Sequence, residues 1–175
     1  MELILTDHLR SHMACHDKEF LEGWEKTFEQ LRLKGTFDYL KGDVERIVTT
    51  FDTPIGYSML LETTDDDEII YAKRLERNLY TRFIKGKEPG YSYQVMCILK
   101  KSQQVNDAYE LITMYPGGNS EKEPEDLHIQ DKEELKRSLL FWRNRALIYI
   151  KENIEPGSEK DYCPYQNLFY ILEDS

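Results

Sequence analysis

The sequence lacks the features by which several protein classes are recognised. Its three cysteines, Cys15, Cys97 and Cys163, are widely spaced and form no CxxC pair. This favours reduced thiols in a cytoplasmic protein over a disulfide framework. No apolar run approaches the length that spans a bilayer, and the start, MELILTDHLRSHM, has too few consecutive apolar residues for a signal peptide. We therefore expect a cytoplasmic protein without a membrane partner.

Familiar catalytic and nucleotide-binding motifs are also missing. The sequence has no glycine-rich phosphate loop before a helix, no GxSxG, no HExxH and no kinase motif. The usual hydrolase, nucleotide-binding and metalloprotease classes are therefore not indicated. We expect neither a cofactor nor a resident metal.

Positive charge is scarce as well. The 23 Lys and Arg residues face 33 Asp and Glu residues, which gives a formal net charge of −10. A chain of this charge does not coat nucleic acid through bulk electrostatics, so nucleic-acid binding would require a local basic patch.

What the chain does contain predicts an α+β fold. Residues 1–45 are expected to be mainly helical, and residues 47–116 alternate as an antiparallel sheet. Residues 131–153 have helical spacing, and residues 158–175 carry enough apolar side chains to dock back. At 40% hydrophobic and 12% aromatic residues, the chain can bury a core. We expect one domain, 1–175, with the N-terminal helical region and C-terminal helix packed on a curved antiparallel β-sheet of about four or five strands.

The densest cationic segment is KRLERNLYTRFIKGK, residues 73–87. It holds six cations and one acid, and its cations are Lys73, Arg74, Arg77, Arg82, Lys85 and Lys87. If the strands at 69–75 and 79–85 pair, Lys73 and Arg82 share a face near Tyr80. Basic and aromatic groups interleaved on a sheet suit a phosphodiester with unstacked bases. The alternative is a solvated hairpin whose charges balance the acidic turn beside it.

Three histidines, His8, His12 and His16, recur at intervals of four and would share one stripe of a helix. Such a stripe can hold a metal, but no carboxylate or cysteine ligand follows at a characteristic spacing. A partly exposed stripe without a metal is the favoured interpretation. His8 alone is a candidate general acid–base if it faces the sheet.

The strand YELITMYP ends on Thr113 and Tyr115 before two glycines. At such a strand exit a threonine hydroxyl can donate to a phosphate oxygen and a tyrosine can stack on a base. Plain strand termination explains the same residues, and both interpretations stay open.

Three segments together resemble a group of small, mostly uncharacterised bacterial proteins. These segments are KRLERNLYTRFIKGKEPGYSYQVMCILKK, YELITMYPGG and LLFWRNRALIY. The basic strand followed by a Thr-x-Tyr-Pro exit also resembles the barnase–EndoU–colicin–RelE superfamily of small ribonucleases and toxins. That resemblance implies a helical region on a curved antiparallel sheet, and cleavage of RNA by the ribose 2′-hydroxyl without metal.

The resemblance also implies residue roles. Lys73 and Arg82 would neutralise the phosphorane, Thr113 would bond a phosphate oxygen, and His8 would act as acid or base. The substrate-binding residues would be Arg74, Arg77, Tyr80, Lys85, Tyr115 and Arg145.

One position departs from the pattern, because Arg145 stands where the family's C-terminal helix usually has histidine. An arginine cannot shuttle protons, although it can hold a phosphate. Three hypotheses follow: a metal-independent ribonuclease or toxin-like protein, a relic of that fold that binds RNA or a cognate protein without catalysis, and an acidic inhibitor or immunity-type protein.

Overall fold

A computed structural model describes residues 1–174 of the chain, and the fold is α+β. Its contacts divide the chain into two compact units. Unit 1 consists of Met1–Ser58 and Gly90–Asn119. Unit 2 consists of Met59–Pro89 and the described residues from Ser120 onward.

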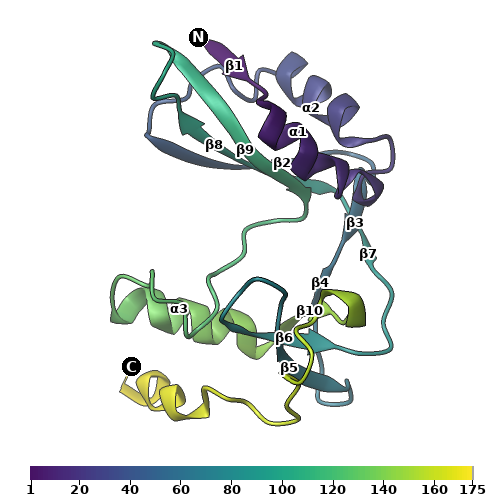
Figure 1. The fold of residues 1–175 in the computed structure, drawn as a ribbon, viewed down its shortest axis with the longest axis vertical. Helices are drawn as coiled ribbons and strands as arrows, with labels where there is room; N and C mark the ends of the chain where they lie inside the picture. Colours follow the sequence, from purple (N-terminus) through teal and green to yellow (C-terminus); the bar gives the residue numbers. More distant parts are fainter. Residues whose placement is uncertain (175) are drawn as a thin grey trace. The chain divides into compact units, whose positions relative to one another are not determined.

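Unit 1 packs helices on one face of a four-stranded sheet (Figure 1). Its helical elements are α1 (Asp7–Ala14), the 3-10 turn η1 (Asp17–Glu19) and α2 (Trp24–Leu33). Its strands are β1 (Glu2–Ile4), β2 (Val44–Thr50), β3 (Gly56–Ser58), β7 (Gly90–Ser92), β8 (Gln94–Lys101) and β9 (Ala108–Pro116). The sheet order is β1-β9-β8-β2, with β1 parallel to β9 and the other pairs antiparallel, and β3 pairs with β7 as a separate ribbon.

Local chemistry fixes where the two helices begin. The side chain of Thr6 accepts a hydrogen bond from the Leu9 amide at 3.1 Å and caps α1. Asp17 does the same for α2, accepting from the Trp24 amide at 2.9 Å across the turn at Gly23. Both helices then bury their apolar stripes against β8 and β9. This core includes Leu9, Met13, Trp24, Phe28, Leu31, Phe37, Val95, Leu99, Leu111 and Met114.

Unit 2 is built on a second four-stranded sheet of order β4-β10-β6-β5. Its strands are β4 (Leu60–Glu62), β5 (Ile69–Lys73), β6 (Tyr80–Ile84) and β10 (Arg145–Ile148). Its helices are α3 (Lys132–Arg143) and the 3-10 helices η2 (Lys151–Asn153) and η3 (Gln166–Asp174). Asp131 caps α3 by accepting from the Glu134 amide at 2.9 Å. The C-terminal tail packs on α3 through Leu139, Tyr165 and Ile171.

The observed elements differ from the expected ones in three places. The region 1–45 begins with a strand, β1, before its helices. The helix expected over 131–153 ends at Arg143, because the following RALI segment is β10, a central strand between β4 and β6. The strands of 47–116 belong to two sheets and a ribbon rather than one sheet, and both sheets are mixed.

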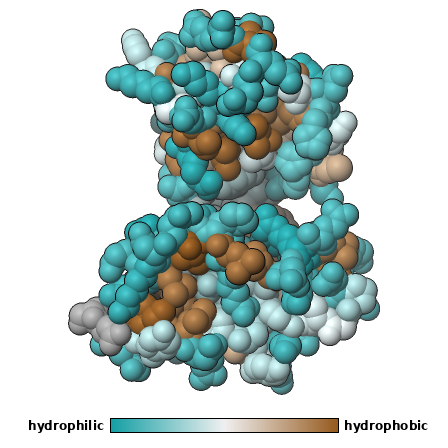
Figure 2. Space-filling model, turned by 60° about the vertical axis from the view of Figure 1, so that its left-hand side comes forward, coloured by the Kyte–Doolittle hydropathy of each residue, from teal (hydrophilic) through white to brown (hydrophobic). Residues whose placement is uncertain are grey.

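The surface is mainly hydrophilic, with separate groups of hydrophobic side chains on each unit (Figure 2). Within residues 1–174, no helix has the length and apolar character that a bilayer-spanning segment requires.

Candidate functional site

The residues predicted for the site belong to different units. Thr113, Tyr115 and His8 lie in unit 1, whereas Lys73, Arg82 and the other predicted binding residues lie in unit 2. Neither unit contains the whole predicted set, so the chemistry of each has to be assessed by itself.

In unit 2 the basic hairpin forms as expected. The register of β5 and β6 places Lys73 opposite Tyr80 and Tyr71 opposite Arg82, so these four side chains share one face of the sheet. The Lys73 ammonium donates to the Asn78 side-chain oxygen at 3.0 Å and lies 5.2 Å from the centre of the Tyr80 ring. This prediction of a common face is confirmed.

Arg82 has structural partners within unit 2. Its Nη1 donates to the Thr63 hydroxyl at 2.8 Å and to the backbone carbonyl of Arg145 at 3.0 Å. The Arg145 guanidinium lies 4.7 Å from the Phe141 ring. A charged donor held in two hydrogen bonds links β6 to its neighbours and is less available to a phosphorane.

Arg74 and Arg77 are held by one buried acid. Both guanidiniums pair with Glu123, whose side chain is 6% exposed, and the Arg77 contact measures 3.6 Å. The Thr81 hydroxyl donates to the same carboxylate oxygen at 3.0 Å. Burial lowers the pKa of Arg74, against the raising effect of Glu123. These arginines therefore fasten the segment around Glu123 to the hairpin.

Lys85, the remaining cation predicted to bind substrate, lies with its ammonium 4.8 Å from the centre of the Tyr149 ring. The Tyr149 hydroxyl donates to Glu159. Lys85 therefore contacts Tyr149 rather than the ring of Tyr80.

In unit 1 the strand exit of β9 contains an irregularity. Ile98 pairs with Thr113 and Leu99 pairs with Leu111, so Ile112 is an extra residue in β9. Such a bulge re-aims neighbouring side chains and is common beside functional sites. The Thr113 hydroxyl lies 3.1 Å from Nε2 of His12, which α1 contributes.

The histidine stripe is the other half of this arrangement. The His12 and His16 rings lie 4.8 Å apart, centre to centre, at an interplanar angle of 56°. Nδ1 of His16 bonds the Glu19 carboxylate, which the 3-10 turn η1 supplies. The order of side chains is thus Glu19, His16, His12 and Thr113, and we call these four residues the histidine cluster.

The environment separates the two imidazoles electrostatically. Burial, and then the nearby His16 and His8, lower the pKa of His12. The hydrogen bond that the Glu19 carboxylate accepts from His16 raises the pKa of His16. The neutral form is therefore favoured at His12, which lies against the Thr113 hydroxyl, and the protonated form is favoured at His16. Two titratable groups whose pKa values are pushed apart are suited to the roles of base and acid.

One cation, Lys18, lies near the histidine cluster, and another, Arg46, lies near Tyr115. Lys18 is close enough to His16 to lower its pKa. Arg46 of β2 stands in the same cross-strand row as Ile98 and Thr113, and its charge opposes the burial that raises the pKa of Tyr115. Tyr115 is thus half-buried and lies near a cation.

The sequence analysis identified the stripe but selected only His8 from it. His8 is exposed, and its effect on His12 is electrostatic, because its charge lowers the pKa of His12. The residues it missed are His12, His16 and Glu19. The spacing of four was the available signal for the histidines, but Glu19 lies beyond the end of α1 and Thr113 is 101 positions from His12. Among residues 1–174, no three His, Cys, Asp or Glu side chains are placed to hold a metal ion.

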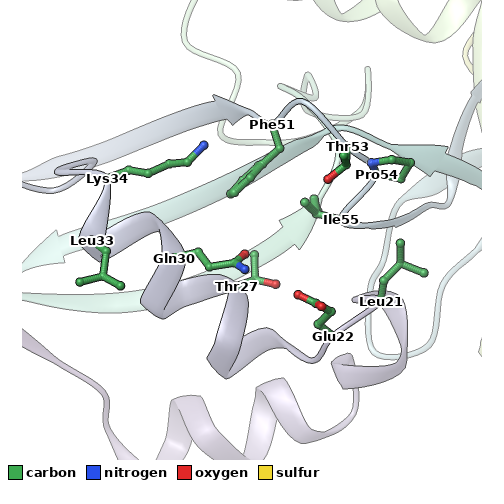
Figure 3. Close-up of a pocket in the computed structure, with 10 residues that line it drawn as sticks. All are labelled: Leu21, Glu22, Thr27, Gln30, Leu33, Lys34, Phe51, Thr53, Pro54 and Ile55. Carbon is green, nitrogen blue, oxygen red and sulfur yellow. The ribbon is translucent and has the colours of Figure 1, made fainter.

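Unit 1 also has a hollow of about 540 Å³ between α2 and the segment after β2 (Figure 3). The Lys34 ammonium lies there, 4.1 Å from the centre of the Phe51 ring. Thr27 and Gln30 also line it, with Ile55 on the opposite side. None of the residues predicted for the site lines this hollow.

Comparison with known proteins gives a likeness of fold. No protein-family model and no curated protein matches the chain. The chain is similar to a solved structure, a conserved hypothetical protein from Toxoplasma gondii ME49, with a TM-score of 0.54 and 14% identity. The match covers 75% of this chain and 88% of that chain. At this identity the likeness shows the fold alone.

Proposed function

We propose that the protein is a metal-independent ribonuclease whose acid–base centre is the histidine cluster of unit 1. The observation that carries this proposal is the close pair of imidazoles, His12 and His16, one bonded to a hydroxyl and the other to a carboxylate. Transesterification of RNA needs a base, an acid and a cation, and no metal.

The steps assign one role to each group. His12 accepts the proton of the ribose 2′-hydroxyl through Nε2, the nitrogen that faces the Thr113 hydroxyl. The 2′-oxygen then attacks phosphorus, and the bond from phosphorus to the 5′-oxygen breaks. His16 gives its proton to that leaving oxygen. The products are a 2′,3′-cyclic phosphate and a 5′-hydroxyl; His12 has gained one proton and His16 has lost one.

Lys18 supplies positive charge near this centre, because it is close enough to His16 to lower the pKa of that imidazole. Lys18 belongs to unit 1, whose charge is otherwise acidic. A cation beside the phosphorane stabilises its developing charge, a contribution that is often the largest in such reactions. The three free cysteines, Cys15, Cys97 and Cys163, support action in a reducing compartment such as the cytoplasm.

The experiment is cleavage of a labelled, mixed-sequence RNA in EDTA by the wild type and by His12→Ala. Loss of the base predicts a fall of about 10²-fold to 10⁴-fold in rate. His8→Ala is the matched control, because this exposed histidine is on the same helix, and we expect its rate to stay near that of the wild type. Equal rates for the wild type and His12→Ala would refute the assignment.

A second function, RNA binding without cleavage, is favoured by one observation. Lys73, opposite Tyr80, donates to a neutral amide and so keeps its charge for a phosphate, whereas Arg82, to which the resemblance gives a catalytic role, is engaged within unit 2. Binding of RNA by a wild type that never cleaves it would favour this function.

A further inference from the structure

Four side chains of unit 2 form a basic and aromatic surface that the proposed centre does not use. Lys73 and Tyr80 come from β5 and β6, where they are register partners. Lys160 and Tyr162 come from the tail that precedes η3. We call these four residues the lysine–tyrosine surface.

The backbone fixes this convergence. The tail runs beside the outer edge of β5, where Lys160 and Tyr71 exchange hydrogen bonds at 2.7 and 2.8 Å. Nearby, the Ser158 hydroxyl accepts from the Lys73 amide at 3.0 Å. Backbone pairing therefore holds the tail beside β5, and it brings Ser158 to Lys73, which lies 85 positions earlier in the chain.

The side chains meet around one ring. The Lys73 and Lys160 ammonium groups lie 5.2 and 5.4 Å from the centre of the Tyr80 ring. Lys160 also lies 5.1 Å from the Tyr162 ring and donates to its hydroxyl at 3.0 Å. Cations over aromatic faces are favourable, and here two ammonium groups share one ring.

The two lysines keep their charge available. In the part of the chain that the structure describes, neither lysine forms an ion pair with a carboxylate. Lys73 bonds a neutral amide and Lys160 a neutral phenol. Tyr162 is 56% exposed and Tyr80 is half-buried, so both rings are accessible. Farther along the same face, the Tyr165 ring packs edge-on against the Tyr71 ring, with their centres 5.7 Å apart, and this contact marks the end of the accessible surface.

We infer that the lysine–tyrosine surface is a subsite for an unpaired stretch of RNA. A base stacks on Tyr80 or Tyr162, and the two lysines neutralise the phosphates beside it. Single-stranded nucleic acid is the ligand that presents an aromatic face and a negative charge at every step. The inference rests on the proposed function, since it assigns a binding role to a substrate that the histidine cluster cuts.

The first experiment measures fluorescence anisotropy with a labelled oligouridylate of about twelve nucleotides. Lys73→Ala/Lys160→Ala and Tyr80→Ala are each expected to weaken binding about tenfold. Loss of two phosphate contacts lowers the salt slope by about 1.4 between about 50 and 200 mM salt. Tyr80→Phe keeps the ring and is expected to bind like the wild type. Lys151→Ala, at an exposed lysine of the same unit, is the control for loss of a positive charge outside this surface.

Cleavage assays separate the subsite from the centre. His12→Ala is expected to bind the oligouridylate with wild-type affinity and to fail to cleave it, whereas the subsite variants bind it weakly. Unchanged oligouridylate affinity in both subsite variants, or equal affinity of the wild type for polyglutamate, would overturn the subsite. Binding that depends on Tyr80 without any cleavage would uphold the subsite and remove the proposed function.

Discussion

Two histidines one helical turn apart have opposite electrostatic surroundings. His16 has a carboxylate partner, Glu19, whereas His12 has a hydroxyl partner and a second imidazole nearby. The two side chains are chemically identical, with His12 on α1 and His16 just beyond its end. The opposite shifts of their pKa values therefore arise from their positions in the fold.

The first prediction concerns proton binding. In an NMR titration of the imidazole carbon-bound protons, we expect His12 to titrate at lower pH than His16. Glu19→Gln removes the carboxylate that raises the pKa of His16, so we expect burial to lower the pKa of His16 in this variant. Titration of both histidines at the same pH, in wild type and variant alike, would contradict the described environment.

The second prediction follows by linkage. The folded pKa of His16 is raised above its ordinary value of 6.5, so its pairing with Glu19 stabilises the fold fully below that value. This stabilisation is lost as the pH rises through the folded pKa. Because the pair is partly exposed, we expect less than about 1 kcal/mol. Urea denaturation of the wild type and of Glu19→Gln should give different stabilities at about pH 5–6, below the ordinary pKa of His16, and these stabilities should converge at higher pH.

At the scale of elements, the segment around Glu123 is tied to the hairpin by one carboxylate. Glu123→Ala would leave Arg74 partly buried without its counter-charge, and we expect a loss of about 3 kcal/mol in the free energy of unfolding. Glu133→Ala, which removes an acid that is 74% exposed, is the control and should change stability little. Equal effects of the two variants would show that the Glu123 contacts are not stabilising.

Gly56 is a second element-scale test, because it allows β3 to approach two neighbouring segments. A Cβ there would lie 2.6 Å from Cγ of Pro116 and would also meet the Glu19 carbonyl oxygen. We expect Gly56→Ala to destabilise the protein by about 1–3 kcal/mol in urea denaturation. Tyr57→Phe, in the same strand, keeps the ring that stacks on Tyr91 at 5.3 Å and should be nearly neutral.

The sequence indicates elements better than it indicates their partners. The α+β class, α2, the basic hairpin and the long β8–β9 pair could be predicted from periodicity, because local spacing determines them. The strand β10 could not be predicted, because its residues continue the helical spacing of α3. They form a strand because they pair with β4 on one side and β6 on the other. The contact from His12 to Thr113 likewise depends on a bulge that no local pattern announces.

At the scale of the whole molecule, the chain has separate cores. Leu31 belongs to the core of unit 1 and Leu139 to a core of unit 2, and both are fully buried. Each Leu→Ala substitution should cost about 2–5 kcal/mol. In native-state hydrogen exchange we expect Leu31→Ala to accelerate exchange mainly in unit 1, and Leu139→Ala mainly in unit 2. Uniform acceleration by both variants would show a single cooperative unit.

The central claim is that the protein cuts RNA through the ribose 2′-hydroxyl. The most direct measurement uses a DNA oligonucleotide that contains a single ribonucleotide, incubated with the wild type in EDTA. The account predicts one cut, on the 3′ side of that ribonucleotide, leaving a 2′,3′-cyclic phosphate and a 5′-hydroxyl. An intact oligonucleotide, or cleavage of the matched all-deoxy control, would contradict it.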